Sequence, residues 1–186
     1  MKFCSACGKT TTIRVPEGDN RERQVCDHCD TIHYQNPNNV VGCILEWEDK
    51  VLLCKRAIEP RYGYWTLPAG FMENNETTME GAAREAFEEA NATAAELKLF
   101  GIYNLPRISQ VYMMFIGGLK DGYISSGEES LEVGLFTEAE IPWDNLAFPI
   151  VVESLQRYFE DRPNHRVHFA DITGRPGRDI TVTRYT

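Results

Sequence analysis

Apolar and polar residues alternate in short runs along most of the chain, and this pattern predicts strands more often than helices. Residues 40–47 and 51–56 are apolar runs on either side of a polar turn at 48–50, which predicts a β-hairpin. A short strand is expected next, at 65–67. Three longer strands are expected later in the chain, at 95–103, 110–119 and 131–137.

Two segments have the period of a helix instead. The first runs from about 78 to 90. The second spans 149–161, where apolar residues recur on one helical face at Val151, Val152, Leu155, Tyr158 and Phe159. The tail, 166–186, predicts two short strands around a Gly-Arg-Pro-Gly turn. Together these elements predict an α+β protein.

The helix at 78–90 has clear end signals and two distinct faces. Thr77 and Glu80 form a capping box at its start, and Asn91 suits the left-handed residue at its end. Glu85, Glu88 and Glu89 share an arc of roughly 100°, so we expect them to face a common point. A separate arc of roughly 140° is expected to pack on a sheet and contains Met79, Ala82, Ala83, Ala86, Phe87 and Ala90.

These glutamates are unusual because almost no positive charge balances them. Residues 71–97 contain one arginine, Arg84, and no lysine. A solvated acidic face is the alternative interpretation, but such faces usually interleave lysines with the acids. Like charges four residues apart on a helix cost roughly 0.2–0.5 kcal/mol per pair, and a bound divalent cation would reverse that sign. A site with oxygen ligands alone suits Mg²⁺ or Mn²⁺ better than zinc.

Four of the six cysteines have the spacing of a metal site. Cys4-x2-Cys7 and Cys26-x2-Cys29 are separated by 18 residues, which is typical of a four-cysteine zinc ribbon. Disulfides are the alternative, but the N-terminal residues contain no secretory signal, which favours zinc. Four thiolates leave no open coordination position, so we expect a structural Zn²⁺. His28 and His33 are nearby spare ligands or, more simply, solvated turn residues.

Composition and charge narrow the possible functions. The chain has 186 residues, of which 42% are hydrophobic and 25% are charged, as in an ordinary globular protein. Its net charge of −9 argues against a general nucleic-acid binder, which needs a basic face. No apolar run is long enough to span a membrane. We therefore expect a cytoplasmic protein with a small-molecule partner and no membrane or nucleic-acid partner.

Residues 70–92 also resemble a known motif. The signature G-x5-E-x7-R-E-U-x-E-E-x-G-U, in which U is apolar, is similar to this segment at Gly70, Glu76, Arg84, Glu85, Glu88 and Glu89. This is the Nudix box. Asn91 departs from the pattern because it replaces the second glycine, although asparagine keeps the left-handed geometry. Ala86 and Ala92 are also smaller than the usual aliphatic residues.

The resemblance extends over about residues 3–160. The ribbon, followed by NPxxVVGC, VLLCKR, WTLPAGF, SLExxLF and EIP, is similar to a Nudix branch that includes plant FAD and ADP-ribose pyrophosphatases. It implies a Nudix α/β/α sandwich with a mixed β-sheet, preceded by a small Cys4 zinc-ribbon β domain. The expected domains are a ribbon at 1–36, a Nudix domain at 37–162 and a C-terminal β extension at 163–186.

The same resemblance implies an activity and a set of active-site residues. The expected reaction is Mg²⁺-dependent (or Mn²⁺-dependent) hydrolysis of FAD to FMN and AMP, or of ADP-ribose to AMP and ribose 5-phosphate. Gly70, Glu85, Glu88 and Glu89 correspond to the family's metal ligands, and Arg84 is expected to hold Glu76 in place. The general base is expected to be Glu129, with Glu132 and Glu85 as alternatives. Candidate substrate-binding residues are Arg56, Arg61, Tyr62, Phe71 and Tyr112.

Other functions remain open at this point. NADH pyrophosphatases also carry a zinc ribbon, but their SQPWPFP-type motif is absent here. An RNA-cap hydrolase would need a basic groove, which the sequence does not show. A zinc-ribbon binding module with a lapsed catalytic domain is the non-enzymatic alternative, but no acid of the box is missing, and residues 1–36 contain five basic and five acidic residues. The family often forms homodimers, which makes a dimer an expectation.

Overall fold

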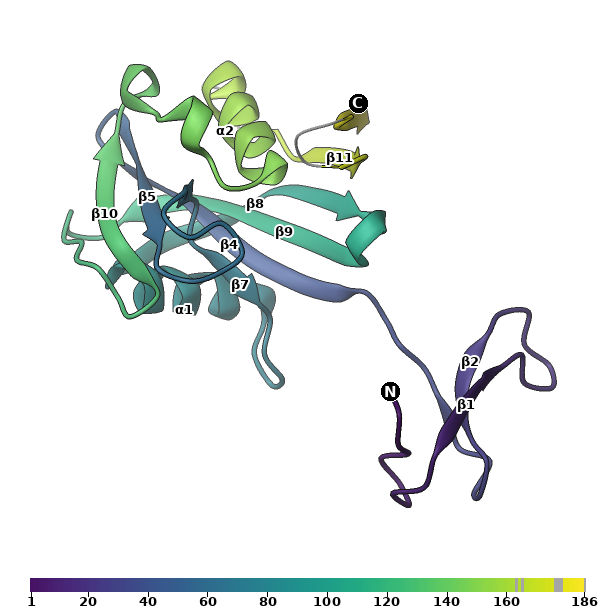
Figure 1. Cartoon of the computed structure of the whole chain (residues 1–186). Coiled ribbons are helices and arrows are strands. Elements are labelled where there is room, and N and C mark those ends of the chain that lie inside the picture. The colour runs from purple at the N-terminus through teal and green to yellow at the C-terminus, as the bar shows by residue number, and fades with distance from the viewer. Residues whose placement is uncertain (163, 165, 176–178, 186) are drawn as a thin grey trace. The chain divides into compact units, whose positions relative to one another are not determined.

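The chain divides into two compact units, Met1–Pro37 and Asn38–Thr186 (Figure 1). We call them the ribbon unit and the sheet unit. The computed structural model describes residues 1–162, 164, 166–175 and 179–185. Within this part of the chain, no helix is both long and apolar enough to cross a membrane.

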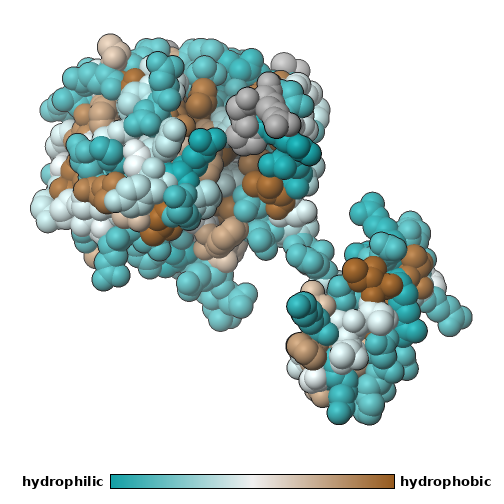
Figure 2. Space-filling view, viewed as in Figure 1, coloured by the Kyte–Doolittle hydropathy of each residue, from teal (hydrophilic) through white to brown (hydrophobic). Residues whose placement is uncertain are grey.

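The ribbon unit is a small antiparallel sheet with little apolar core. Its strands β1 (Thr11–Arg14), β2 (Arg23–Cys26) and β3 (Ile32–His33) follow one another in the sheet. Its buried hydrophobic residues are Cys4, Val25 and Cys26, whereas apolar side chains such as Ile13 and Tyr34 are exposed. Figure 2 shows hydrophobic residues at the surface of this unit. A unit of this size cannot bury enough apolar surface alone, so a cross-link or a metal must supplement its core.

A mixed, nine-stranded sheet forms the centre of the other unit. Its main path runs in the order β10-β5-β4-β9-β8-β11-β12, with β6 paired to β5 and β7 paired to β4. The pairs β4–β9 and β8–β11 are parallel, and the others are antiparallel. The strands are β4 (Asn38–Trp47), β5 (Lys50–Arg56), β6 (Trp65–Thr66), β7 (Ala69–Phe71), β8 (Ala94–Leu105), β9 (Gln110–Leu119), β10 (Ser130–Phe136), β11 (His168–Thr173) and β12 (Thr181–Tyr185).

Two helices cover opposite faces of this sheet, α1 (Thr78–Ala90) and α2 (Pro149–Asp161) (Figure 1). Alternate residues of a strand point to opposite faces, so β4 contributes to two cores. Val41 and Leu45 pack with the alanines of α1, whereas Ile44 packs with residues of α2 such as Leu155. This layered arrangement confirms the predicted α/β/α sandwich. Three short 3-10 helices complete the unit, η1 (Pro106–Ile108), η2 (Glu138–Glu140) and η3 (Trp143–Asn145).

The C-terminal strands belong to the same sheet. β11 pairs in parallel with β8, and β12 forms the outer edge by pairing with β11. The two strands predicted in the tail are therefore present. Part of the predicted turn between them, residues 176 and 177, lies outside the described residues.

The packing face of α1 differs from the predicted one. Met79 and Phe87 are 49% and 57% exposed, whereas Glu85 and Glu89 are buried. The helix lies so close to the sheet that a Cβ on Gly81 would be 2.8 Å from Cγ2 of Val41. Such a close approach admits alanine and glycine and leaves no room for bulky side chains. The predicted packing face was therefore centred too far round the helix from Gly81. The face that packs on the sheet includes Gly81 and the two glutamates beside it, Glu85 and Glu89.

Candidate active site and metal centre

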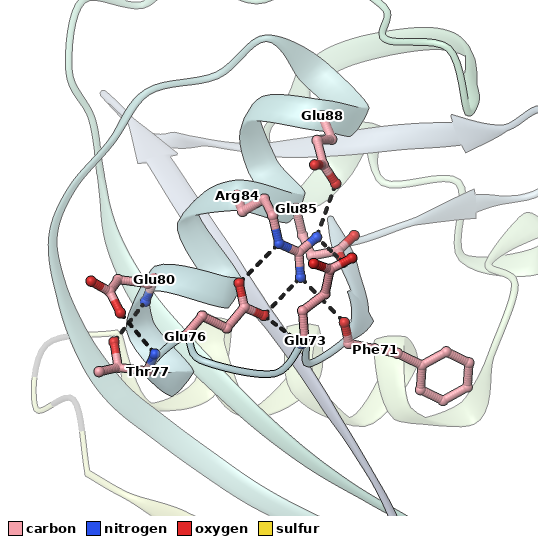
Figure 3. A network of polar contacts seen from close by, with 8 residues as sticks. All are labelled: Phe71, Glu73, Glu76, Thr77, Glu80, Arg84, Glu85 and Glu88. Atoms are coloured by element: carbon pink, nitrogen blue, oxygen red, sulfur yellow. Dashed lines mark hydrogen bonds and ion pairs between the residues drawn. The ribbon is translucent and has the colours of Figure 1, made fainter.

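Arg84 is the centre of a network of carboxylates on α1 (Figure 3). Its Nε and Nη2 atoms donate to both oxygens of Glu76, at 3.0 and 2.9 Å. Its Nη1 atom donates to Glu85 at 2.7 Å and to Glu88 at 2.9 Å, and Nη2 also donates to the carbonyl oxygen of Phe71 at 3.2 Å. One guanidinium therefore joins three carboxylates to the end of β7.

Glu76 serves this network by ordering the segment before α1. Its Oε1 atom accepts a hydrogen bond of 2.7 Å from the backbone N–H of Glu73. The hydrogen bonds from Arg84, followed by the one from Glu73, lower the pKa of Glu76 to about 2. Glu76 is therefore an anion at any pH near neutrality. Thr77 and Glu80 begin the helix with the predicted capping box.

Glu85 and Glu89 are the buried acids of α1. Glu89 is 6% exposed, and its Oε2 atom is buried without a hydrogen-bond partner among the described residues. Burial, followed by the charge of Glu85, raises the pKa of Glu89 to about 8. Burial also raises the pKa of Glu85. The carboxylate of Glu85 fills the space where a side chain on Gly70 would lie, so only glycine fits at that position.

These acids provide a suitable donor set for a hard divalent cation. They offer only oxygen atoms, and the orphaned Oε2 of Glu89 lacks the partner that a buried carboxylate normally has. All three glutamates line the same cleft, where Glu85 and Glu88 both pair with Nη1 of Arg84 and Glu88 is more than half exposed. Among the described residues, the only group of three or more ligand atoms within 4.8 Å of one another is the cysteine cluster.

The buried glutamates open into a cleft of about 1220 Å³. That volume exceeds the roughly 300–1,000 Å³ of typical small-molecule sites, so an extended dinucleotide fits. The structure places these predicted site residues along it: Arg56, Gly70, Phe71, Arg84, Glu85, Glu88, Glu89, Tyr112 and Glu129. The cleft is also lined by Ile108 of η1, Ile172 of β11 and Ile180, which precedes β12, and we call these three residues its apolar wall.

Arg56 also lines the cleft. Its Nε atom donates to the carbonyl oxygen of Pro60 at 2.9 Å, and its guanidinium lies 5.2 Å from the ring centroid of Phe148. The positive charge of Arg56 lowers the pKa of Glu89 and so partly offsets the effect of burial. Arg56 is therefore near the carboxylates. Tyr112 is half-buried in the floor of the cleft, and burial raises the pKa of its hydroxyl.

Two predicted substrate-binding residues do not line this cleft. Arg61 stacks on the ring of Tyr64, at 5.3 Å from the centroid, and faces a separate pocket that Arg184 also lines. Tyr62 is 55% exposed. Both belong to the loop between β5 and β6, and its path could not be inferred from local sequence.

The two acids considered as general base outside α1 occupy different positions. Glu129 lines the cleft, and its charge raises the pKa values of Glu85 and Glu89. Its backbone carbonyl oxygen accepts a hydrogen bond of 2.8 Å from the N–H of Ala57. Glu132 lies in β10 and forms an ion pair of 3.3 Å with Lys55, outside the residues that line the cleft.

Sequence reasoning did not include the apolar wall of the cleft. Ile108, Ile172 and Ile180 are far from the carboxylate helix in the sequence, and they meet it only because β8 and β11 are neighbours in the sheet. The alternating pattern of the tail was the available signal, since it predicted strands there. The sequence did not indicate which sheet those strands would join.

The ribbon unit brings its four paired cysteines together. The Sγ atoms of Cys4 and Cys29 are 3.7 Å apart, and those of Cys7 and Cys26 are 3.5 Å apart. Thiolates at the vertices of a tetrahedron around Zn²⁺ at ~2.3 Å would be separated by about 3.8 Å. The cysteines therefore fit a closed tetrahedral site.

The two cysteine pairs lie in equivalent knuckles. The N–H of Gly8 donates to Cys4 O at 2.9 Å, and the N–H of Asp30 donates to Cys26 O at 3.2 Å. Both Gly8 and Asp30 have positive φ, as the tight turn requires. In addition, Nε2 of His33 lies 3.3 Å from the Sγ atom of Cys4.

The remaining cysteines take no part in either site. Cys43 and Cys54 are 0% and 1% exposed in the core between α1 and the sheet. The Cys43 thiol donates to the carbonyl oxygen of Ala82 at 3.6 Å. Burial raises the pKa of both thiols, so they act as small apolar residues, as predicted.

Comparison with known families gives the class of this protein. A zinc-ribbon family model described as "Nudix N-terminal" matches residues 2–35, and the NUDIX domain model matches residues 36–157. The chain therefore belongs to the Nudix hydrolase family and carries the N-terminal ribbon of that family. A crystal structure of a NUDIX hydrolase from Nitrosomonas europaea is 55% identical, with a TM-score of 0.86, and the match covers 92% of this chain and 99% of that one.

Curated relatives are more distant and carry two kinds of name. An ADP-ribose pyrophosphatase from Methanocaldococcus jannaschii is 33% identical over 62% of this chain and 69% of its own length. A NAD-capped RNA hydrolase NudC from Photobacterium profundum is 28% identical over 76% of this chain and 52% of its own length. The chain thus spans about half the length of that NudC relative.

Proposed function

We propose that this protein is a Mg²⁺-dependent diphosphatase that hydrolyses the pyrophosphate of a nucleoside diphosphate-linked molecule, most specifically FAD or ADP-ribose. The observation that carries the proposal is the pair of buried carboxylates, Glu85 and Glu89, that line a cleft large enough for a dinucleotide. Buried acids with raised pKa values in a cleft are typical of functional sites. The relative named ADP-ribose pyrophosphatase supports the same substrate class.

The proposed reaction is attack of water on one phosphorus of the diphosphate. The bond from that phosphorus to the bridging oxygen breaks, and two monophosphates result. Glu85, Glu88 and Glu89, together with the carbonyl oxygen of Gly70, would hold Mg²⁺ (or Mn²⁺), which neutralises the diphosphate and acidifies water. We assign the proton of the attacking water to Glu129, because it lines the cleft, which Glu132 does not, and because its charge raises the pKa values of Glu85 and Glu89.

Two arginines have different roles in this scheme. Arg84 forms ion pairs with Glu76, Glu85 and Glu88, so we assign it the role of orienting these acids and not of contacting substrate. Arg56 lines the same cleft as the carboxylates, where it can contact a phosphate. Most of the rate enhancement in such phosphoryl chemistry comes from positioning and charge neutralisation.

The apolar wall favours a substrate with a ring system attached to its diphosphate. Ile108, Ile172 and Ile180 offer apolar surface on which a flat base or flavin ring can pack, and the ring of Phe148 lies nearby. A chain of net charge −9 otherwise repels an anionic substrate. The apolar contact, together with the metal and Arg56, would offset that repulsion.

The four-cysteine site of the ribbon is proposed to hold one structural Zn²⁺. Its sulfur–sulfur separations match tetrahedral thiolate coordination, and no position is left for a substrate. Bound zinc would stabilise the ribbon unit in place of a hydrophobic core, because this unit buries few apolar residues.

Hydrolysis of NAD-capped RNA is a second candidate, because the NudC relatives carry that name. NADH hydrolysis is grouped with this candidate, because a pyrophosphate bond of a nicotinamide dinucleotide is broken in both reactions. The balanced charge of the ribbon unit and the net charge of −9 are unfavourable for binding a long polyanion. The small dinucleotide is therefore the preferred substrate.

One experiment separates these substrates. The purified protein is incubated with Mg²⁺ and with FAD, ADP-ribose, NADH, a diadenosine polyphosphate or a NAD-capped RNA, and the products are identified by mass. We expect FMN and AMP from FAD, or AMP and ribose 5-phosphate from ADP-ribose, at rates well above those for capped RNA. Cleavage of capped RNA alone would reject the preferred substrate, and cleavage of none, with intact fold and metal, would reject the diphosphatase proposal.

A further inference from the structure

The end of α1 carries the residue at which this chain departs from the Nudix pattern. Asn91 has φ 49° and ψ 26°, the left-handed conformation in which glycine is the usual residue. Its N–H donates to Phe87 O at 2.8 Å, and the N–H of Ala92 donates to Ala86 O at 3.2 Å. The backbone of Asn91 therefore ends the helix as a glycine would, and its side chain is not needed for that role.

That side chain binds the loop that leads to β10. Its Nδ2 atom donates to the carbonyl oxygens of Ser125, at 3.2 Å, and Ser126, at 3.4 Å. Because both partners are acceptors, the amide must direct its NH₂ group towards the loop. Glycine, the residue of the family pattern, has no group that could make these bonds.

The loop returns two hydrogen bonds to the same helix end. The N–H of Ser125 donates to Ala90 O at 2.9 Å, and the N–H of Gly127 donates to Glu89 O at 3.0 Å. Gly127 is in such close contact that a Cβ there would overlap the carbonyl oxygen of Glu88. Two main-chain bonds and the Asn91 amide thus fix residues 125–127 against the turn of α1 that carries Glu88 and Glu89.

Residues 125–127 lead directly to Glu129. The side chain of Glu129 is exposed on the cleft, and among the described residues no hydrogen bond holds its carboxylate. Its position therefore depends on its backbone, which the N–H of Ala57 fixes on one side and residues 125–127 fix on the other. A shift of those residues would move Glu129 relative to Glu85 and Glu89.

We propose that Asn91 is a positioning residue that sets the place of Glu129 over the buried carboxylates by clamping residues 125–127 to the end of α1. The inference rests on the proposed function, in which Glu129 accepts a proton. It assigns the asparagine of this chain a role that the glycine of the Nudix pattern cannot perform. Asn91 itself lines the cleft, but its amide binds Ser125 and Ser126, so its effect is assigned to Glu129 and not to contact with the reacting atoms.

The test is Asn91→Gly, which keeps the left-handed helix end and removes only the amide. Loss of two neutral hydrogen bonds is expected to lower kcat for the substrate identified above about tenfold, with KM and the Mg²⁺ requirement unchanged. Asn91→Asp, which has a similar shape but cannot donate, is expected to lower kcat at least as much. The matched control is Asn75→Gly, another asparagine at positive φ (69°), which lies outside the cleft and should keep full activity.

A double-mutant cycle distinguishes this role from a general structural one. Glu129→Gln lowers kcat by itself, and adding Asn91→Gly should then have little further effect, because the clamp acts through the residue already removed. An equal tenfold loss in the Glu129→Gln background would overturn the proposal. So would an unchanged kcat for Asn91→Gly, or a rise in KM alone, which would place Asn91 in contact with substrate.

A measurement without substrate separates this inference from the proposed function. Hydrogen exchange at the amides of Ser125 and Gly127 should be about tenfold faster in Asn91→Gly than in the wild type or in Asn75→Gly. Faster exchange in a protein that hydrolyses no diphosphate would reject the proposed function and leave the clamp in place. Unchanged exchange would reject the clamp, whatever the activity.

Discussion

The ribbon unit and the carboxylate helix each gather candidate metal ligands, but they hold them in different states. The sulfur atoms of the ribbon lie 3.5 and 3.7 Å apart in two equivalent knuckles, so one ion satisfies them without rearrangement. On α1, Arg84 holds Glu85 and Glu88, while Glu89 is buried with one oxygen that has no partner in the described part of the chain. The cysteine site is suited to a permanently bound structural ion. The glutamates of α1 remain available for a cation that arrives with substrate.

The largest expected effect is on turnover. Glu89→Gln keeps the shape of the buried side chain but removes the carboxylate that a cation would bind, and Glu88→Gln does the same at the exposed position. Each should reduce kcat by about 10²–10³-fold with the fold and zinc content intact, because charge neutralisation supplies most of the catalysis. Steady-state kinetics and circular dichroism provide the measurement. Glu80→Gln, which changes an exposed cap residue of the same helix, is the control, and near-normal rates in Glu88→Gln and Glu89→Gln would remove both glutamates from the site.

Metal removal should separate the two sites. Metal analysis of the purified protein is expected to find about one zinc per chain, retained under mild chelation that abolishes Mg²⁺-dependent activity. Cys26→Ser should lose the zinc and unfold the ribbon unit, because that unit has few other buried residues. The sheet unit, which has its own two cores, should keep its cooperative unfolding transition. Disulfides among Cys4, Cys7, Cys26 and Cys29 would contradict the zinc assignment.

Protons should accompany the cation at α1. The pKa of Glu89 is raised to about 8 in the folded protein, above the ordinary value near 4.5, so Glu89 is mostly protonated at pH 7. Its favourable contribution to stability is full below about pH 4.5 and is lost as pH rises through about 8. Because a cation needs the carboxylate, Mg²⁺ affinity should increase as pH rises towards 8, and binding at pH 7 should release roughly one proton.

Titration calorimetry in buffers of different ionisation enthalpy measures that release. The wild type should show a heat of Mg²⁺ binding that depends on the buffer, whereas Glu89→Gln should not. A buffer-independent heat in the wild type would mean that Glu89 is already ionised at pH 7 or does not bind the cation.

Local signals in the sequence predicted the parts of the sites that local geometry determines. The spacing of the cysteines implied a closed tetrahedral site, and Thr77 and Asn91 marked both ends of α1. The depth of Glu85 and Glu89 could not be predicted, because it depends on how closely α1 approaches the sheet at Gly81 and Gly70. The periodicity of a helix fixes the angles between its side chains. Which side chains face the core depends on the tertiary contacts of the helix.

The cleft shows the same limit over longer distances. Arg56 and Tyr112 line it as expected, but Arg61 and Tyr62 do not, although Ile58, Glu59 and Pro60 of the same loop do. Ile172 of the apolar wall belongs to β11, which joins the sheet beside β8, and nothing in the strand pattern specifies that neighbour. A single sequence therefore does not predict which residues come together in a site because of the order of strands in the sheet.

The smallest expected effect concerns the surroundings of the zinc site. His33 lies within hydrogen-bonding distance of Cys4 Sγ, at 3.3 Å, whereas the side chain of His28 is exposed. A donor to a metal-bound thiolate typically contributes about 10–100-fold to metal affinity. His33→Ala should therefore weaken zinc binding about tenfold in competition with a chromophoric chelator, and His28→Ala should leave it unchanged. Equal affinities for the two variants would show that the four thiolates alone determine the site, which would make the difference from the Arg84-supported carboxylates sharper still.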